Sequence, residues 1–388
     1  MQKINNTNTI YDIAIIGAGA SGLMLASQLS SKYSACIIDT NDRIGEKLKV
    51  CGGGKCNITN KTLSSDNYQG ESDFIASVLD KFDNNNVINF FENNGVSLNI
   101  ADRVVKGQYF AKSSSYILDM FVNLISHHKL FLNTTILEVK YIDEVYEIIS
   151  KNKIIKCKKL IVASGGLSFT NLGASNLGYE IASQFGHTFS KTSASLVGYT
   201  VQKDEFWFKT LSGLSLYINI DVNGKLIDGN ILFAHKGCSG PAIMNSSVYW
   251  KKGNMEIDFL PNDTLDKYIK SNALISSALP LPKRFIKEFL IQIGLEDKPM
   301  SKLSKDELEK LKLLKKYSFA PAGTFGYTKA EVTRGGINTN EINVNNMESK
   351  LQKNLYFLGE VLDVTGELGG YNLQWAFSTA YICAKSLK

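Results

Sequence analysis

The 388-residue sequence predicts an α/β fold in which a parallel-sheet domain is interrupted by an inserted domain of a different kind. Three observations support this prediction. A strand–helix–strand pattern with clustered glycines opens the chain, short antiparallel-type strand runs begin near residue 196, and a second glycine-rich strand–helix pattern follows residue 329. We therefore expect a first domain made of residues 1–195 and 329–388, and an inserted domain at residues 196–328.

The opening pattern has the form of a dinucleotide-binding βαβ unit. Ile13 to Ile16 predict a buried strand, and a helical pattern then runs through Leu29. A second strand, Ala35 to Ile38, ends at an acidic residue about 20 residues after the glycines, where a ribose-binding carboxylate belongs. The candidate contacts are Gly17, Ala18, Gly19, Ala20, Ser21, Gly22 and Asp39. A chance glycine turn is the alternative, and the spacing serves FAD and NAD equally.

The inserted domain is expected to be β-barrel-like over about residues 196–261 and helical over about residues 262–318. Strands are predicted at Tyr217–Asp221, Ile231–Ala234, Ser247–Trp250 and Met255–Leu260. Asn223-Gly224 predicts a hairpin turn, an amphipathic helix is predicted from Pro282 to Ile293, and Ser304 to Glu307 form a helix capping box. The basic run Lys310–Lys316 is interpreted as a solvated helix face.

Composition narrows the function classes. The formal net charge of +6 is too small to predict a nucleic-acid partner by itself. Six cysteines in 388 residues do not make a disulfide framework, and no apolar stretch has the length of a membrane span, so we expect a cytoplasmic protein. The four histidines and six cysteines show no zinc-type spacing, and we expect no metal site.

Five further blocks run in order along the chain. They are KLKVCGGGKCNITN (residues 47–60), LIVASGG (160–166), AHKGCSGPA (234–242), EVTRGGI (331–337) and FLGEVLDVTGELGGYNLQWA (357–376). With these blocks the chain resembles the HI0933-like or BaiN-like family of NAD(P)/FAD-dependent oxidoreductases. The resemblance implies a Rossmann-like FAD-binding domain of the glutathione-reductase type, interrupted by an inserted domain.

Four positions or segments depart from the pattern of that family. Cys51 stands where the family usually has serine, Lys55 where it has arginine, and Ala380 where a glycine is common. Residues 107–111 read GQYFA, whereas the family tends to show GRVFP. Because this loop is expected near the active site, the resemblance does not transfer a substrate.

The resemblance also implies which residues contact the cofactor. Besides the first motif, they are Lys47, Gly52, Gly53, Gly54, Lys55, Asn57, Val139, Ala163, Ser164, Gly165, Gly359, Glu360, Gly369, Gly370, Tyr371 and Asn372. Glu360 is expected to bind the ribityl chain. The partly positive helix N-terminus after Gly370 would stabilise a reduced, anionic flavin. Glycine at residues 52–54 would let the backbone approach a phosphate or the flavin edge.

The expected activity is hydride exchange between flavin N5 and a small organic substrate in a cleft between the two domains, with NAD(P)H as the electron donor. Cys56, Thr333, Arg334 and Tyr371 are the catalytic candidates. His235 is either a substrate-facing donor or a residue that fixes its loop, and the second interpretation is slightly favoured. The oligomeric state is left open.

Two other functions remain as alternatives. The first is an FAD-dependent protein that modifies or binds RNA, which a basic face with interleaved aromatic residues on the inserted domain would indicate. The second is a disulfide reductase that uses Cys51 and Cys56, which have C-x4-C spacing. A second glycine fingerprint and a C-terminal His-Pro segment, both typical of such reductases, are missing from the sequence.

Overall fold

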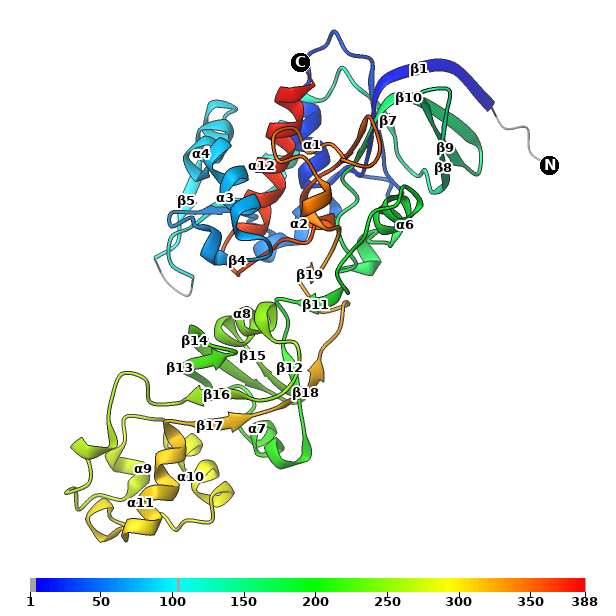
Figure 1. The fold of residues 1–388 in the computed structure, drawn as a ribbon. Coiled ribbons are helices and arrows are strands. Elements are labelled where there is room, and N and C mark those ends of the chain that lie inside the picture. Colours follow the sequence, from blue (N-terminus) through cyan, green and yellow to red (C-terminus); the bar gives the residue numbers. More distant parts are fainter. Residues whose placement is uncertain (1–4, 103–104, 388) are drawn as a thin grey trace. The chain divides into compact units, whose positions relative to one another are not determined.

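The computed structural model describes residues 5–102 and 105–387, and it divides the chain into two compact units (Figure 1). The first unit comprises residues 1–193 and 331–388, and the inserted unit comprises residues 194–330. The short strands β11 (Ser193–Ser195) and β19 (Val332–Arg334) lie at these two boundaries in the sequence. Each unit has its own cluster of buried apolar side chains.

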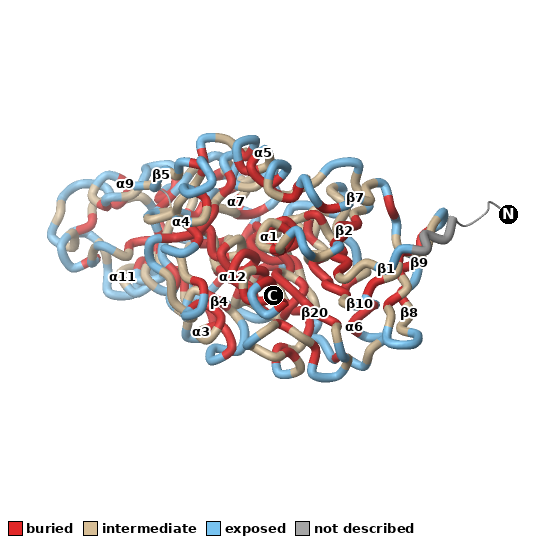
Figure 2. The backbone as a smooth tube through the Cα atoms, turned by 90° about the horizontal axis from the view of Figure 1, so that it is seen from above, coloured by how far each residue is buried: buried red, intermediate tan, exposed pale blue. Residues whose placement is uncertain are grey.

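Seven described strands form the main sheet of the first unit, in the order β7-β2-β1-β10-β9-β8, with β20 beside β10. Their bounds are β1 (Asn5–Ile16), β2 (Ala35–Ile38), β7 (Lys129–Phe131), β8 (Ile136–Ile142), β9 (Val145–Ser150), β10 (Lys153–Val162) and β20 (Leu355–Phe357). The pairs from β7 to β10 and β10 to β20 are parallel, and β8 and β9 add antiparallel pairs. The parallel strands β2 and β20 are buried along their whole length, which explains their continuous apolar sequences, whereas the edge strand β7 is partly exposed (Figure 2).

The remaining elements of the first unit surround this sheet. The helices are α1 (Ala20–Gln28), α2 (Glu46–Val50), α3 (Ser72–Lys81), α4 (Asn84–Asn93), α5 (Ser114–Leu124), α6 (Leu177–Gln184) and α12 (Tyr371–Ser386). The minor strands are β3 (Asn57–Asn60), β4 (Tyr68–Gln69), β5 (Leu98–Ile100), β6 (Gln108–Ala111) and β21 (Thr365–Gly366). The C-terminal α12 packs against α1 and against β3, so the last element of the chain completes the region around the first glycine motif.

Seven described strands of the inserted unit form one antiparallel sheet in the order β17-β16-β13-β14-β15-β12-β18. They are β12 (Tyr199–Val201), β13 (Ser215–Val222), β14 (Lys225–Ala234), β15 (Gly237–Ser239), β16 (Met255–Asp258), β17 (Tyr317–Phe319) and β18 (Pro321–Thr324). The two edge strands β17 and β18 are separated in the chain by Ala320 alone, so the sheet curls into a nearly closed barrel. The helices are α7 (Trp207–Thr210), α8 (Pro241–Tyr249), α9 (Ile275–Ala278), α10 (Lys283–Gln292) and α11 (Lys305–Leu311).

These observations confirm the predicted fold class, an α/β domain with a parallel sheet and an inserted barrel-like domain. The capping box of Ser304 and Glu307 is present at the start of α11. The predicted strand at Ser247–Trp250 is wrong, because Ser247 lies in α8. Pro241 occupies the first turn of this helix, and the Ser247 hydroxyl bonds the carbonyl of Met244 one turn back at 2.6 Å.

Candidate active site

The loop between β1 and α1 leaves open space beside its backbone. Gly17 has φ +106°, and a Cβ there would collide with the carbonyl of Ala163, so glycine is required. A Cβ at Gly22 would collide with the carbonyl of Gly17. At Gly19, in contrast, no described atom lies within 4 Å of the Cβ position, and α1 begins without a side-chain cap. The first turn of α1 thus presents backbone N–H groups to open space, as diphosphate binding requires.

The loop after β10 offers a second opening in the first unit. The Ser164 Oγ is buried and has no hydrogen-bond partner in the described residues. Gly165 follows with φ +73° and no described atom within 4 Å of its Cβ position. An unpartnered buried hydroxyl next to a glycine in open space fits a bound polar group. With the opening at Gly19, these residues fit FAD, the cofactor that the sequence predicts.

Asp39 lies beside the first glycine loop, as expected. Its Oδ2 accepts a hydrogen bond from Ala18 N at 2.7 Å, and its Oδ1 accepts one from Asn41 N at 2.8 Å. The carboxylate therefore holds the glycine loop through Oδ2 and the turn after β2 through Oδ1, and each oxygen keeps a second lone pair for a ribose.

Lys47 and Glu360, which are 313 residues apart, form an ion pair with an Nζ–Oε2 distance of 2.6 Å. The other oxygen of Glu360 accepts a hydrogen bond from Thr333 N at 2.9 Å. Lys47 Nζ also lies 5.8 Å from the ring centroid of Phe169. Two residues that were predicted separately to contact the cofactor thus neutralise each other.

Thr333 organises the loop that follows β10. Its Oγ1 accepts hydrogen bonds from Leu167 N at 2.7 Å and Ser168 N at 3.0 Å, and the residue is buried. This role is structural support for the region near Ser164. Arg334, the next residue on β19, is half-buried.

The glycine loop after α2 curls tightly. The φ angles of Gly52, Gly53 and Gly54 are +56°, +65° and +86°, and Cys56 also has a positive φ of 60°. The side chain of Asn57 lies against Gly52, and its Oδ1 accepts a hydrogen bond from Gln108 Nε2 at 2.7 Å. No described atom lies within 4 Å of a Cβ at Gly53, so this loop also leaves room for a ligand.

The two cysteines of this loop are free thiols that interact with each other. A hydrogen bond from the Cys56 thiol lowers the pKa of Cys51, and the nearby Lys47 charge acts in the same direction. The pKa of Cys56 is raised well above its usual range by the interaction with Cys51 and by burial. Lys55 lies over the ring of Phe110, with Nζ 5.4 Å from the centroid.

The residues at the start of α12 are committed to the protein itself. A Cβ at Gly370, where φ is +99°, would lie 2.5 Å from the carbonyl oxygen of Thr59. The Tyr371 hydroxyl donates to the carbonyl of Thr62 at 3.0 Å, and burial raises its pKa to about 12. The Asn372 amide bonds Gly366 N and O at 2.9 Å and 2.8 Å. These side chains hold the loops around β3 and β21 in place.

Three further predicted residues pack against other parts of the first unit. The carbonyl of Val139, on β8, accepts a hydrogen bond from Gln184 Nε2 at 2.7 Å. Gly359, with φ +70°, faces the Ser21 hydroxyl closely enough to exclude a Cβ. A side chain at Gly369 would crowd the Asn60 amide, which donates to the Gly369 carbonyl at 3.1 Å.

Glu331 is a residue of this region that the sequence did not single out. It lies near Cys51 and Lys47, and burial raises the pKa of its carboxyl group while the Lys47 charge opposes that rise. In the sequence, Glu331 is marked only as the first residue of the block EVTRGGI, whose catalytic candidates are Thr333 and Arg334.

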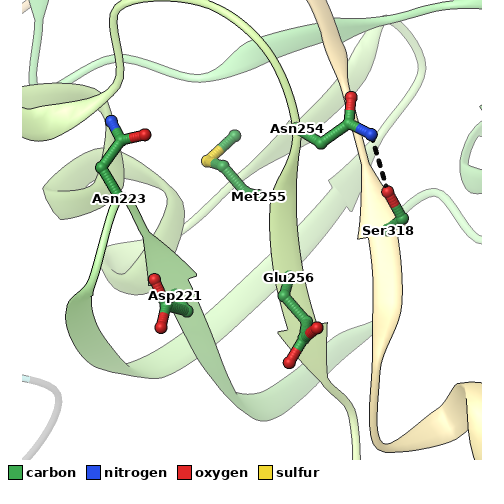
Figure 3. Close-up of a pocket in the computed structure, with 6 residues that line it drawn as sticks. All are labelled: Asp221, Asn223, Asn254, Met255, Glu256 and Ser318. Atoms are coloured by element: carbon green, nitrogen blue, oxygen red, sulfur yellow. Dashed lines mark hydrogen bonds between the residues drawn. The ribbon is translucent and has the colours of Figure 1, made fainter.

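The predicted catalytic residues Cys56, Thr333, Arg334 and Tyr371 all belong to the first unit. His235 belongs to the inserted unit, where it is exposed at the turn between β14 and β15. A polar pocket of the inserted unit is lined by Asp221, Asn223, Asn254, Met255, Glu256 and Ser318 (Figure 3). None of the predicted site residues lines this pocket.

Two classes of site are not found in the described part of the chain. No group of three or more histidine, cysteine or acidic side chains there is arranged to hold a metal ion. No helix among residues 5–102 and 105–387 combines the length and apolar character needed to cross a bilayer.

Comparison with known proteins places this site in a family. The model of the HI0933-like protein Rossmann domain matches residues 11–386. The "Ribosomal RNA dihydrouridine synthase" of Haemophilus influenzae is 36% identical over 96% of this chain and 97% of its own length. The "3-dehydro-bile acid delta(4,6)-reductase" of Clostridium scindens is 27% identical over 96% of this chain and 98% of its own length.

A solved structure supports the fold alone. The quinol fumarate reductase subunit FrdA of E. coli superposes with a TM-score of 0.52 at 14% identity, over 100% of this chain and 70% of that one. The chain therefore belongs to the HI0933-like family and is a flavin-dependent oxidoreductase.

Proposed function

We propose that this protein is an FAD-dependent reductase that saturates the C5=C6 bond of a uracil base in ribosomal RNA, with NAD(P)H as the electron donor. The observation that carries the proposal is the 36% identity, over 96% of the chain, to the rRNA dihydrouridine synthase of H. influenzae. The identity to the bile acid reductase is lower, at 27%. Both names describe the reduction of a substrate. The same kind of flavin site could serve both reactions if the residues around it differ.

The cofactor would be held by the residues whose surroundings leave room for it. Gly19 and the first turn of α1 would take the diphosphate, and Asp39 the ribose. Ser164 and Gly165 would contact the cofactor along the loop after β10. Bound FAD would supply the hydride chemistry, which side chains cannot provide.

Reduction of a carbon–carbon double bond also needs a proton donor on the protein. Cys56 Sγ is a candidate, because it is a protonated thiol in the glycine loop that is expected to contact the cofactor. Glu331 is a second candidate. It would hold its proton more readily than an ordinary glutamate, because its carboxyl group is desolvated. The Lys47–Glu360 pair would position the loops on either side of these groups.

A lysine-rich edge of the first unit favours RNA over an uncharged small molecule. We call Lys49, Lys55, Lys61, Lys106 and Lys112 the lysine edge. Residues 47–62 and 105–115, which carry it, contain no aspartate or glutamate. Pairing of β3 with β6 brings the two segments together, because Lys61 N bonds Gly107 O at 2.7 Å and Ala111 N bonds Lys55 O at 3.0 Å. Lysines of this kind bind phosphates.

Aromatic side chains are interleaved with the lysine edge. Tyr109 and Phe110 are half-buried, and Phe110 lies beneath the Lys55 ammonium group. A base can stack on such a ring, which is a common mode of single-stranded RNA recognition. The basic and aromatic face that would indicate RNA binding was expected on the inserted domain, and we propose instead that it lies beside the flavin loop of the first unit.

The test is an anaerobic reaction of the FAD-loaded protein with in vitro transcribed ribosomal RNA and either NADPH or NADH. Mass spectrometry of the digested RNA should detect dihydrouridine only when protein, RNA and one of the two donors are present. The K61A/K106A/K112A variant should lose at least about tenfold in kcat/KM for RNA, because three phosphate contacts are removed. The matched control, K310A/K312A/K316A, removes three lysines from the inserted unit and should retain the activity.

Two outcomes would overturn the proposal. If NAD(P)H bleaches the flavin and an unsaturated ketone is reduced, while RNA gains no dihydrouridine, the substrate is a small molecule like that of the C. scindens relative. If the folded protein takes up no FAD, the flavin assignment itself fails.

A further inference from the structure

The Cys51 and Cys56 thiols are brought together by the local backbone. Cys56 N donates a hydrogen bond to Cys51 O at 3.1 Å, which closes a turn of six residues. Three glycines with positive φ make this turn possible, and Cys56 itself adopts a φ of 60°, a conformation that non-glycine residues rarely take. The Cys56 side chain also lowers the pKa of the Cys51 thiol, so the two thiols interact. The backbone therefore holds two sulfur atoms side by side at some conformational cost.

The two thiols have different surroundings. Cys51 is half-buried, whereas Cys56 is fully buried. The hydrogen bond with Cys56 lowers the pKa of Cys51, and the Lys47 charge acts in the same direction, while burial and the Glu331 charge oppose the shift. Cys56 keeps its proton. A partly exposed thiol with a lowered pKa beside a buried thiol is the arrangement of an attacking cysteine and its resolving partner.

The other cysteines of the chain do not share these features. Cys36, Cys157, Cys238 and Cys383 are fully buried, and burial raises the pKa of each. They should react slowly with any reagent in solution. The reactivity is thus confined to one loop of the first unit.

We propose that Cys51 and Cys56 form a thiol–disulfide exchange site whose substrate is a low-molecular-weight disulfide. The Cys51 thiolate attacks one sulfur of the disulfide, whose S–S bond breaks, and the first small thiolate leaves and takes a proton. The Cys56 sulfur then attacks Cys51, its proton passes to the second small thiolate, and an internal disulfide remains. Two protein thiols are oxidised, and one small disulfide is reduced to two thiols. This exchange goes beyond the proposed RNA reduction and requires no flavin.

Oxidation would alter the loop that is expected to contact the cofactor. An internal disulfide would fix the turn around Gly52, Gly53 and Gly54, and it would remove the proton that Cys56 holds. Because the resemblance places serine at position 51, this chemistry would distinguish the present chain from relatives that lack the pair.

The test uses the whole protein, reduced and then freed of reductant, with glutathione disulfide as the probe. Peptide mass spectrometry should find an internal Cys51–Cys56 disulfide and the release of two glutathione molecules per protein. The C51S variant should form no such link, and its consumption of glutathione disulfide should fall at least about tenfold, because the attacking thiol is lost. The C36A variant, which removes a buried cysteine of β2, should behave like the wild type and serves as the matched control.

A mixed disulfide that persists on Cys51 would show that Cys56 does not resolve it, and would overturn the pair as a unit. Equal consumption of glutathione disulfide by the wild type and by C51S would overturn the site altogether. Serine at position 51 matches the family pattern, so C51S is expected to fold, and its circular dichroism spectrum verifies this. The RNA assay is independent, because it runs on the fully reduced protein.

Discussion

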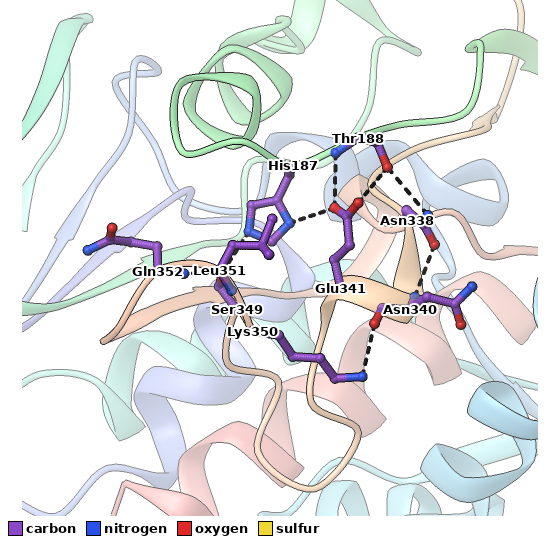
Figure 4. Close-up of polar contacts among 9 residues, drawn as sticks. All are labelled: His187, Thr188, Asn338, Asn340, Glu341, Ser349, Lys350, Leu351 and Gln352. Atoms are coloured by element: carbon purple, nitrogen blue, oxygen red, sulfur yellow. Dashed lines mark hydrogen bonds and ion pairs between the residues drawn. The ribbon is translucent and has the colours of Figure 1, made fainter.

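At the scale of single residues, His187 joins two segments of the first unit that are far apart in the sequence (Figure 4). Its Nδ1 lies 3.0 Å from Glu341 Oε2, and its Nε2 lies 2.7 Å from Ser349 Oγ. The order Ser–His–Glu has the form of a hydrolytic triad. However, Ser349 Oγ also accepts hydrogen bonds from the backbone N–H groups of Leu351 and Gln352, at 3.0 Å and 2.9 Å. These bonds occupy the oxygen, so the arrangement is a structural clamp.

This clamp predicts a pH dependence of stability. Burial lowers the pKa of His187 below the unfolded value of 6.5, although Glu341 opposes the shift. As the pH falls below about 6.5, the unfolded chain takes up a proton that the folded chain resists. The free energy of unfolding should therefore be fully retained above pH 6.5 and fall as the pH drops toward the folded pKa. Each unit of depression corresponds to about 1.4 kcal/mol.

Urea unfolding at pH 7.5 and 5.5 measures this loss, and the H187Q variant should lose less between the two pH values than the wild type does. Part of the pH dependence should remain in the variant, because burial also lowers the pKa of His128, with the same sign. An unchanged pH dependence in H187Q would rule out His187 as a contributor.

At the scale of elements, the start of α12 shows how a motif can serve the fold and the site together. Gly370 allows α12 to begin against the backbone of Thr59, on β3. In the same region Thr59 Oγ1 donates to Gln374 Oε1 at 2.5 Å, and Gln374 Nε2 donates to the carbonyl of Phe82. This buried network ties α12 to two other elements. The glycine pair is therefore required for close packing whether or not a flavin is bound.

We predict that G370A destabilises the protein by about 3 kcal/mol or more, because a positive φ and a collision with Thr59 both oppose alanine. Gly95 is the matched control, since it has a φ of +81° but no described atom within 4 Å of its Cβ position. G95A should lower the free energy of unfolding only by the cost of the positive φ for alanine, about 1 kcal/mol. Urea denaturation of both variants measures the difference. Equal losses would show that the contact with Thr59 relaxes without cost.

Elements with a strong local signal were predictable from the sequence. The strand Ala35–Ile38 was predicted with its observed bounds, and the capping box of α11 forms as expected. The strand predicted at Ser247–Trp250 failed, because a short apolar run does not distinguish a strand from a buried helix. Partners distant in the sequence were not predictable either. Lys47 and Glu360 were each predicted to contact the cofactor, but their mutual ion pair depends on the tertiary fold.

At the scale of the whole molecule, charge and core are divided between the two units. The inserted unit carries 19 lysine and arginine residues against 14 acidic residues, so it holds most of the net charge of +6. Several of its lysines are paired, as Lys315 is with Asp258 at 2.7 Å and Lys298 is with Glu307 at 2.6 Å. Within the run 310–316, Lys310, Lys312 and Lys316 are exposed, as a solvated helix face requires, whereas Lys315 is half-buried. If the lysine edge is the RNA-binding surface, RNA binds the first unit, although most of the net charge lies in the inserted unit.

The inserted unit has a core of its own, and this leads to a prediction about folding. Trp207 is buried among Phe208, Phe285 and Phe289, and its Nε1 donates to the Tyr317 hydroxyl at 3.1 Å. These residues come from both the barrel and the helical part, so one core stabilises the whole unit. We expect a fragment of residues 194–330 to fold alone and to unfold cooperatively in urea.

Tryptophan fluorescence provides the measurement, because Trp207 and Trp250 lie in the inserted unit and the third tryptophan, Trp375, lies in the first. The W375F variant of the full chain therefore reports on the inserted unit alone. Its fluorescence transition should have the same slope against urea as that of the fragment, because the slope follows the surface exposed on unfolding. A fragment with a broad, non-cooperative transition would show instead that residues 194–330 need the first unit in order to fold.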